Sequence, residues 1–326
     1  MSSLNNKPLK LLQLIIFNLC ICIASSCLAG SYAYITNQGD NSVSVIDTEK
    51  NQVTATINVG KGPVGVAVAQ SKNRVYVSNV ESQSISVIDI TSNLVIDELV
   101  TGGSPVGLAL SPDEKTLYVA DWYDNHILAI DTENKQSRRF LSGGESPAGL
   151  IVSPDGKSLY IANRDSNEVA VIKTSTLELS SRIVVGKHPY GLNLNKDGNL
   201  LFVVNVQANS VSVIDTNNGH SYTIAVGDHP YCASSSPDGA FLYVSNTQGD
   251  NISVIDLISR QVIATIPTGS YPEGVSYEND SHRIYVANWG DNSVSVIDAR
   301  SNKLIGSIPT GIQSRAFGQF MIQAQH

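Results

Sequence analysis

A segment of about 42 residues recurs seven times along this 326-residue chain, and that period restricts the fold more than any other feature of the sequence. Each copy contains a short run with an aromatic anchor and an Asn or Asp, followed by a run that ends in V-I-D or a close variant. Contiguous repeats of this length are typical of propellers and solenoids and argue against two unrelated domains. The anchors lie 42 residues apart, with one step of 41: Tyr34, Tyr76, Tyr118, Tyr160, Phe202, Tyr243 and Tyr285.

Each repeat contains four strand-like runs, separated by turn-forming residues, and no helical stretch. In the second repeat these runs are PVGVAV (63–68), RVYVSN (74–79), SISVID (84–89) and LVIDELV (94–100). The composition agrees, because Val, Ile, Ser and Asn are abundant and long runs of strong helix formers are missing. The sequence therefore predicts an all-β fold, a seven-bladed β-propeller of four-stranded antiparallel blades.

The two ends of the repeat array predict a closed ring. The first repeat begins at a second strand, over residues 32–36, and has no first strand of its own. After the seventh repeat the chain supplies a spare first strand, over residues 315–320. Each set of second, third and fourth strands has a first strand only if this C-terminal strand completes the N-terminal blade. We therefore expect a propeller closed in that way.

The motifs YITN, YVSN, YIAN and YVAN are each followed by a run such as V-S-V-I-D and then by V/T-G-x-x-P. In these motifs the chain resembles the YVTN-repeat family of seven-bladed β-propellers, which includes surface-layer-like and lactonase-like proteins. The resemblance covers roughly residues 32–320. It implies the fold and an exported or cell-surface location. Relatives of the fold include lactonases and cofactor-bearing oxidoreductases, so function has to be argued from the site.

The first 29 residues lie outside the repeats. Lys7 and Lys10 precede an apolar run, residues 11–28, that ends in small residues. This order predicts a secretory signal peptide over residues 1–29 and a single mature propeller domain over residues 30–326. We therefore expect an exported protein that is periplasmic, extracellular or at the cell surface, with no membrane span once the signal is removed. We expect a monomer.

Two other interpretations of this segment stay open: a retained membrane anchor, and a lipoprotein modified on Cys27. Three of the four cysteines lie in the segment, so the mature protein keeps only Cys232 and forms no internal disulfide. The formal net charge is −8 and becomes −10 when the two lysines of the segment are lost. A nucleic acid is therefore not expected as the partner.

The repeat explains several motifs that resemble functional sites. GKGPVG (60–65) fits the G-x-G-x-x-G fingerprint of dinucleotide sites, but it lies between two strands and contains a proline. The Asp of each V-I-D run is expected to bond the backbone of the following turn. Cys232 occupies a first-strand position that other repeats fill mostly with Gly, so we expect a buried, inert thiol.

The repeat does not explain the residues on either side of the proline in the fourth-to-first strand loop. The first three blades carry small or apolar residues there, whereas the next four carry polar and aromatic ones: His188 and Tyr190, His229 and Tyr231, Tyr271 and Glu273, and Gln313 and Arg315, which flank Ser314 in place of the proline. Strands alternate in direction, so the second-to-third strand loops open on the same side. They add Trp122, Tyr123, Arg164 and Trp289. We call the surface formed by these two sets of loops the decorated rim.

We expect the protein to bind a small organic ligand, a peptide or a surface protein on the decorated rim, without chemistry and without a cofactor. Alternation along a strand predicts that His188 and Tyr190 face the same way. A ligand with a hydrogen-bonding or anionic end would then meet Arg315 and the imidazoles. The alternative is a metal-dependent lactonase-like or lyase-like enzyme with a divalent metal on His188, His229 and Glu273. A purely structural surface protein is a third interpretation. Whether the chain is an enzyme stays open.

Overall fold

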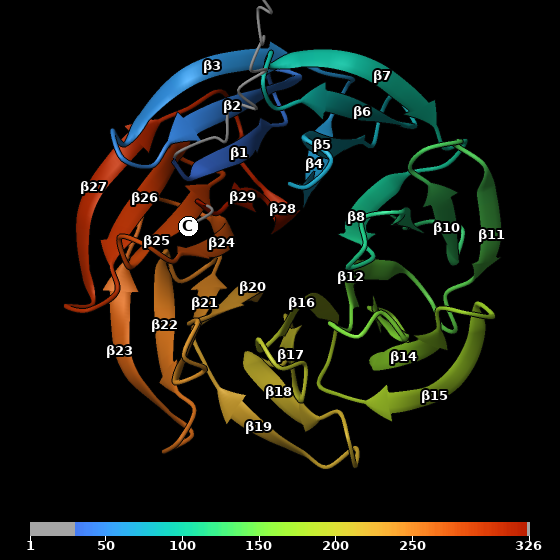
Figure 1. The fold of residues 1–326 in the computed structure, drawn as a ribbon. Helices are drawn as coiled ribbons and strands as arrows, with labels where there is room; N and C mark the ends of the chain where they lie inside the picture. The colour runs from blue at the N-terminus through green and yellow to red at the C-terminus, as the bar shows by residue number, and fades with distance from the viewer. Residues whose placement is uncertain (1–29, 325–326) are drawn as a thin grey trace, which may run out of the picture.

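The computed structural model describes residues 30–324, which form strands, turns and bends and contain no helix. The predicted signal peptide, residues 1–29, lies outside the described residues. Seven antiparallel sheets are arranged around one axis, as Figure 1 shows. The predicted seven-bladed propeller is therefore confirmed. We number the blades 1 to 7 along the chain, so that blade 1 holds the N-terminal strands.

The two inner strands of each blade come from the beginning of each repeat. The first strands, from blade 2 to blade 7 and then blade 1, are β4 (Pro63–Ala69), β8 (Pro105–Leu110), β12 (Pro147–Val152), β16 (Pro189–Leu194), β20 (Pro230–Ser235), β24 (Pro272–Glu278) and β29 (Met321–Ile322). The second strands, from blade 1 to blade 7, are β1 (Tyr32–Asn37), β5 (Arg74–Asn79), β9 (Thr116–Asp121), β13 (Ser158–Asn163), β17 (Leu200–Asn205), β21 (Phe241–Asn246) and β25 (Arg283–Asn288).

The two outer strands follow in the same order of blades. The third strands are β2 (Ser42–Asp47), β6 (Ser84–Asp89), β10 (His126–Asp131), β14 (Glu168–Lys173), β18 (Ser210–Asp215), β22 (Asn251–Asp256) and β26 (Ser293–Asp298). The fourth strands are β3 (Gln52–Asn58), β7 (Leu94–Val100), β11 (Ser137–Leu141), β15 (Glu178–Val184), β19 (Ser221–Ala225), β23 (Gln261–Pro267) and β27 (Lys303–Pro309).

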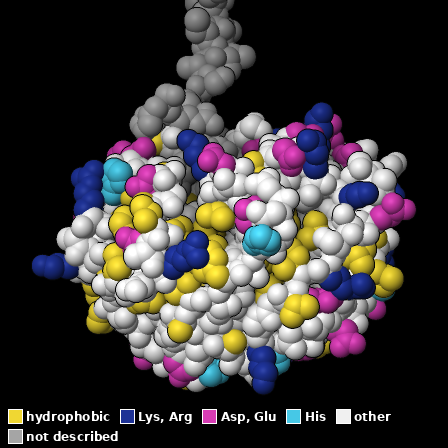
Figure 2. All heavy atoms as spheres, turned by 90° about the horizontal axis from the view of Figure 1, so that it is seen from below, with side chains coloured by type: hydrophobic (Ala, Val, Ile, Leu, Met, Phe, Trp, Pro, Cys, Tyr) yellow, Lys and Arg dark blue, Asp and Glu magenta, His cyan; other side chains and the backbone are white. Residues whose placement is uncertain are grey.

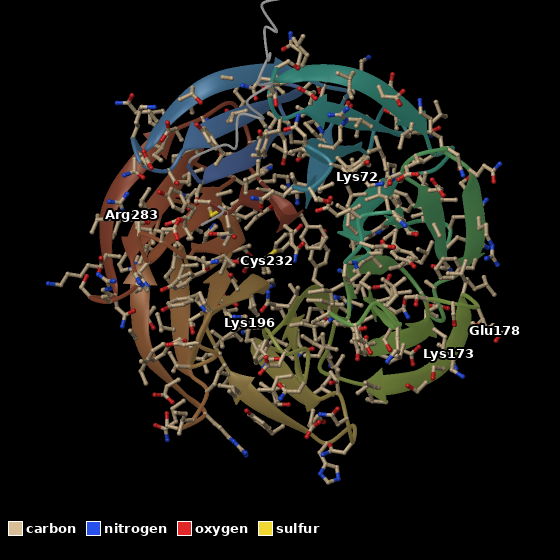
Figure 3. All side chains as sticks on the ribbon, viewed as in Figure 1. Lys72, Lys173, Glu178, Lys196, Cys232 and Arg283 are labelled. Atoms are coloured by element: carbon tan, nitrogen blue, oxygen red, sulfur yellow. The ribbon has the colours of Figure 1, made fainter. Side chains whose placement is uncertain are left out.

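Side chains change character from the axis to the edge of the ring. Second and third strands are buried on both faces, whereas most positions of the fourth strands are exposed. Figure 3 shows Cys232 close to the axis, and Lys173 and Glu178 near the outer edge of blade 4. Figure 2 views the ring edge-on, where apolar side chains lie among charged ones. The core therefore runs between neighbouring blades, which explains why the repeat has two continuous apolar strands.

Hydrogen bonds explain the Asn that ends the second strand. Asn37 Nδ2 donates to Ser42 Oγ at 3.0 Å and to Ser44 Oγ at 2.9 Å. The same pattern recurs from Asn79 to two serines of its own third strand. At the other end, Asp47 Oδ1 accepts hydrogen bonds from two backbone N–H groups of the following turn, at 3.1 and 3.0 Å. The Asn and Asp positions are thus structural, and the bond from the Asp to the turn backbone is the one predicted.

Close approach of neighbouring blades explains the small first-strand position. A Cβ atom added to Gly65 would lie 2.2 Å from the carbonyl oxygen of Val106 in the next blade. Cys232 fills the same position in blade 6 and is buried, and burial raises the pKa of its thiol far above the ordinary value. The expected burial of this thiol is confirmed, and a thiolate nucleophile is not formed there.

The C-terminal segment closes the ring, as predicted, but it does so with a broken strand. β29 pairs with β1 through Met321 and Ile322, and Ser314 forms a separate bridge to Asn37. Between these two contacts, β28 (Phe317–Gln319) leaves blade 1 and pairs in parallel with β4. It lies close to the ring axis (Figure 1). The predicted first strand over residues 315–320 is therefore interrupted in its middle.

The backbone gives the reason for this interruption. Ala316 and Gly318 have φ values of 74° and 108°, in the region that a regular strand does not use. These two residues turn the chain out of the blade 1 ladder and then back into it. As a result, the side chains of Phe317 and Gln319 are presented to the channel rather than to a neighbouring sheet. Phe317 is buried and packs against tyrosines of blades 5 and 6.

Candidate functional site

The decorated rim is held together by hydrogen bonds between its two sets of loops. The backbone N–H of His188 donates to Asn167 Oδ1 at 2.9 Å, and that of His229 donates to Asn209 Oδ1 at 3.0 Å. Tyr271 repeats this contact. Each bond ties a fourth-to-first loop to the second-to-third loop of the preceding blade. The variable side chains therefore rest on a rigid frame.

The residue before the rim proline has a left-handed backbone in every proline-containing loop except that of Ser104, and this separates it from the residue after the proline. The φ values are 54° at His188 and 50° at His229. Tyr190 is buried and contacts the aromatic cluster of the channel, whereas the His188 side chain remains 22% exposed and faces Asp165, 3.9 Å away. The expectation that His188 and Tyr190 share one face is not met, because strand alternation begins only after the left-handed residue.

The inner layer of the rim is a buried polar network centred on Arg315. Its Nε donates to Glu273 Oε2 at 2.6 Å and its Nη2 to Glu273 Oε1 at 3.1 Å, which makes a bidentate ion pair. The same Nη2 donates to the Tyr231 hydroxyl at 2.7 Å, which in turn donates to the Tyr190 hydroxyl at 2.8 Å. Nη1 donates to Gln38 Oε1 at 3.1 Å. Four predicted site residues thus meet, but they bind one another.

Burial sets the protonation states of this network. It raises the pKa of the Glu273 carboxyl, and the Arg315 guanidinium opposes that rise. Burial would lower the pKa of Arg315, but Glu273 more than reverses this and keeps the guanidinium charged. Burial also raises the pKa of Tyr190 to about 12 and that of Tyr231 well above its ordinary value. Both phenols stay protonated at neutral pH, so neither is a general base there.

An aromatic cluster closes the channel below this network. The Tyr190 ring lies 4.3 Å from the Tyr231 ring and 4.8 Å from the Phe317 ring, measured between centroids. Trp122 lies 5.7 Å from Tyr190. Sequence analysis did not single out Phe317. The sequence does distinguish this residue. The segment AFGQF (316–320) departs from the pattern of the other first strands, such as GVAVA in blade 2, and Phe317 is the one aromatic residue at its position in the repeat.

The outer layer of the rim is open to solvent and carries the remaining predicted residues. The Arg164 guanidinium lies 5.7 Å from the centre of the Trp122 ring. The rings of Tyr271 and Trp289 meet edge-to-face at 6.0 Å, and Tyr271 is 49% exposed. Tyr123, next to Trp122, is 80% exposed. These aromatic side chains form the accessible surface of the rim.

The two rim histidines lie beside carboxylates of the outer layer. His229 Nδ1 is 2.8 Å from Asp228 Oδ1, and this hydrogen bond lowers the pKa of the Asp228 carboxyl. Burial and then the Arg164 charge lower the pKa of His188, while Asp165 opposes them. His188 Nδ1 is buried and has no hydrogen-bond partner among the described residues. The His188 imidazole therefore gains its charge only at a pH below its ordinary range.

The ligand set of the metal alternative is not assembled. Within residues 30–324 no three His, Cys, Asp or Glu side chains are grouped so that they could hold a metal ion. Glu273 is bound by Arg315, while His188 and His229 lie beside different aspartates. The geometry consequently gives the metal-dependent enzyme no support. No helix of the described chain is long and apolar enough to cross a membrane.

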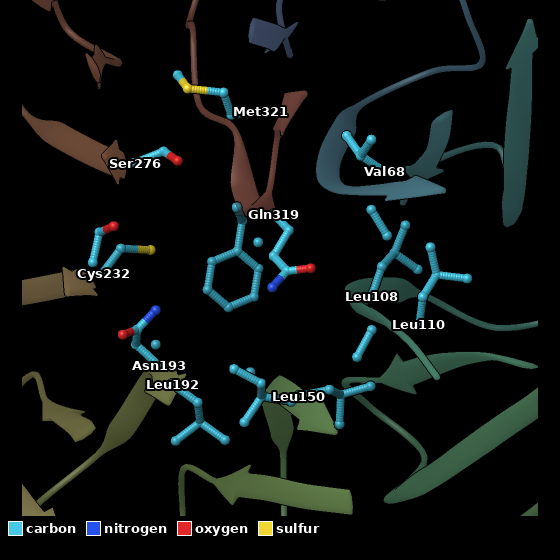
Figure 4. Close-up of a pocket in the computed structure, with 18 of the residues that line it drawn as sticks. Val68, Leu108, Leu110, Leu150, Leu192, Asn193, Cys232, Ser276, Gln319 and Met321 are labelled. Atoms are coloured by element: carbon cyan, nitrogen blue, oxygen red, sulfur yellow. The ribbon is translucent and has the colours of Figure 1, made fainter. Parts of the chain in front are cut away.

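A cavity of about 430 Å³ occupies the channel on the side away from the decorated rim. Figure 4 shows its lining, with Leu108, Leu150 and Asn193 among the labelled side chains. Sequence analysis did not predict this cavity. Its lining comes from the ends of the first strands and from the interrupted C-terminal strand, whose course the repeat pattern does not reveal.

Comparison with known proteins agrees with this geometry. The chain matches the model of a family described as YNCE-like β-propeller over residues 20–322. Its fold is similar to that of the Kuenenia stuttgartiensis hydrazine synthase, with a TM-score of 0.75 and 26% identity over 81% of this chain and 91% of that chain. A functionally unknown protein from Desulfotomaculum acetoxidans has the same TM-score at 16% identity, over 88% of this chain and 99% of that one.

Two further matches are partial. The dihydro-heme d1 dehydrogenase NirN, solved in complex with DHE, has a TM-score of 0.67 at 17% identity. The match covers 85% of this chain and 63% of the NirN chain. The PE-PGRS family protein PE_PGRS18 of Mycobacterium tuberculosis is 58% identical over 40 residues, which are 12% of this chain and 9% of that protein. Forty residues are about one repeat, so this last match concerns the repeat and not the whole protein.

Proposed function

Because this chain belongs to the YNCE-like β-propeller family, we propose that it is an exported scaffold that binds a peptide or protein partner on the decorated rim. The fold supplies a rigid ring, and the function depends on the loops that the ring carries. One observation carries the proposal. Solvent-exposed aromatic side chains, above all Tyr271 and Tyr123, lie on rim loops that hydrogen bonds tie to neighbouring loops. Exposed aromatic residues on rigid supports are favoured at protein interfaces, because little conformational entropy is lost on binding.

The closed inner layer favours a macromolecular partner over a small ligand at this rim. Arg315 already donates hydrogen bonds to Glu273, Tyr231 and Gln38. The channel mouth beneath them is filled by the Tyr190, Tyr231 and Phe317 rings. An anionic ligand end would have to compete with Glu273 for the guanidinium. The sequence-based idea of an anionic group held by Arg315 therefore has no support, and the exposed outer layer is the part available for contact.

The charge of the decorated rim indicates the chemistry of the partner. Its loops carry eight exposed carboxylates: Asp40, Glu81, Asp124, Glu145, Asp165, Asp228, Asp250 and Asp291. Against them stand Lys61, Arg164 and Lys187, and Arg164 is bonded to Asp165. The loops of the opposite rim carry Asp and Glu in the same number as Lys and Arg. We therefore propose a partner with a cationic segment that also presents aromatic or apolar side chains.

Panning of a random peptide phage library against residues 30–326 tests the proposal. We expect enrichment of peptides that combine Lys or Arg with aromatic residues, and binding that weakens as salt is raised. The double variant Tyr123→Ser with Tyr271→Ser should lose this binding and keep its fold. Ser is accepted at the second site, because Ser146 occupies the equivalent left-handed position in another loop.

Ile258→Ser is the matched control, since Ile258 is 87% exposed on the opposite rim. It should bind the selected peptides as the wild type does. The proposal fails if no sequence class is enriched. It also fails if the selected peptides bind the double variant and the wild type equally well.

Export is the second part of the proposal. It is supported by the charged flank, apolar run and small-residue exit of the first 29 residues. It is also compatible with a mature chain whose one cysteine, Cys232, is buried. N-terminal sequencing of the protein from its native host should find a chain that begins near Gly30 or Ser31. A chain that still begins at Met1 would contradict export by cleavage, and lipid on Cys27 would replace it with a lipoprotein.

A further inference from the structure

We propose that the channel cavity opposite the decorated rim binds one small, uncharged organic molecule with an apolar body and a hydrogen-bonding end. The cavity, of about 430 Å³, has the size of small-molecule sites in proteins. It lies on the other face of the ring from the proposed peptide surface and shares none of its exposed residues. This inference does not depend on the function proposed for the rim.

The cavity is closed at its inner end. Phe317 reaches it from β28, and the Tyr190 and Tyr231 rings lie 4.8 and 6.0 Å from the Phe317 ring. Above these rings the Arg315 and Glu273 pair fills the channel mouth at the decorated rim. The channel is therefore a blind pocket that opens only at the opposite rim. A ligand in it would be surrounded by the first strands of all the blades, which removes most of its surface from water.

The lining has one apolar side and one polar side. At the fifth position of the first strand, blades 2 to 4 carry Ala67, Ala109 and Ile151, whereas blades 5 to 7 carry Asn193, Ser234 and Ser276. Leu108, Leu110 and Leu150 add to the apolar side (Figure 4). A ligand with an apolar body and one polar end would match both sides at once.

Several polar groups of the lining are not used by the protein. The Ser276 hydroxyl and the Gln319 amide make no hydrogen bond to other described residues. Asn193 accepts one bond through Oδ1 from the Ser235 N–H, at 3.2 Å, which leaves its NH₂ group free. Ser234 Oγ accepts one from the Tyr277 N–H at 3.1 Å, which leaves its O–H free. Donors and acceptors are thus available to one end of a ligand.

The charge of the lining selects against ions. Glu114 is the one charged side chain among the described residues that line the cavity, and it lies near the opposite rim. Its carboxylate accepts hydrogen bonds from the backbone N–H groups of Ser71 and Lys72, at 3.1 Å each. An ionised ligand deeper in the channel would lose its hydration and meet no opposite charge. The site therefore fits an uncharged molecule.

A pair of dyes with the same aromatic framework tests this inference. N-phenyl-1-naphthylamine is uncharged, and 8-anilino-1-naphthalenesulfonate adds one sulfonate; both become fluorescent in apolar surroundings. We expect the neutral dye to bind residues 30–326 saturably with one site per chain. The sulfonate should bind at least tenfold more weakly. Gln319→Trp should fill the cavity and weaken the neutral dye at least tenfold, because Gln319 is exposed to the channel and a larger ring fits there.

Gln207→Trp is the matched control, since Gln207 is exposed in a loop of the decorated rim. It should bind the neutral dye as the wild type does, and so should the double variant Tyr123→Ser with Tyr271→Ser. Ser276→Leu provides a second block from another blade. The inference is overturned if both dyes bind alike, if the neutral dye does not saturate, or if folded Gln319→Trp and Ser276→Leu proteins bind it unchanged.

Discussion

At the scale of single residues, the rim positions divide into those that serve the fold and those that remain free. Arg315 and Glu273 are variable in the repeat and were therefore candidate ligand contacts. Their side chains are only 16% and 12% exposed, and they neutralise each other. Tyr271 and Tyr123, by contrast, have large exposed fractions, although the Tyr271 ring also packs on the edge of Trp289. A position whose residue varies among the repeats is not required by the blade fold. This variation does not show whether the residue binds a ligand or fills the channel.

The buried ion pair allows a quantitative test by denaturation. Arg315→Met leaves the Glu273 carboxyl buried without its counter-charge, so we expect the free energy of unfolding to fall by about 3–5 kcal/mol. Arg315→Met combined with Glu273→Met should lose much less than the single variant, because no unpaired charge remains. Urea unfolding of the wild type, both single variants and the double variant provides the coupling energy.

Lys157→Met is the control for this cycle, because the Lys157 and Asp155 ion pair is exposed at 3.2 Å. It should change the free energy of unfolding by less than about 1 kcal/mol. If Arg315→Met costs no more than this control, the network does not hold the channel mouth. If the double variant costs as much as the two single variants together, the pair is not coupled.

At the scale of strands and loops, the sequence predicted nearly all of the fold, because each element repeats. The four strands of blade 2 match the expected runs to within a residue. The interrupted strand β28 (Phe317–Gln319) could not be predicted in the same way, since it occurs once. Its course depends on left-handed backbone at Ala316 and Gly318 and on hydrogen bonds to β4, a partner distant in the sequence. A unique segment offers no second copy from which its geometry can be inferred.

The loops show a similar division. The shared rim of the two loop sets was predicted from strand direction, and the structure brings Trp122, Arg164 and Tyr190 into one neighbourhood. The separation of His188 from Tyr190 was missed. The residue that could have revealed this separation is Gly62, which occupies the equivalent position in another loop and has a φ of 63°. A glycine at one copy of a position points to left-handed backbone, which all the equivalent residues except Ser104 adopt here, and strand alternation does not apply there.

At the scale of the whole molecule, the C-terminal segment connects the closure of the ring, the rim network and the channel cavity. The segment from Ser314 to Ile322 completes blade 1, provides Arg315 to the rim network and places Phe317 across the channel. Gln319 then lines the cavity on the other side. One short segment thus closes the ring and separates an acidic, aromatic rim from a blind pocket with one apolar and one polar side. We conclude that this segment holds both faces of the molecule in place.

Thermal unfolding of a protein that lacks residues 312–326 tests this role of the C-terminal segment. Without β28 and β29 the N–H of Tyr34 and the carbonyl of Thr36 lose their partners, and the edge of β1 is exposed. We expect loss of a cooperative transition or insolubility, and loss of N-phenyl-1-naphthylamine binding. A synthetic peptide of residues 312–326 should restore a cooperative transition in proportion to its concentration. A truncated protein that melts at the same temperature and with the same cooperativity as the intact chain would show that the C-terminal segment does not hold the ring together.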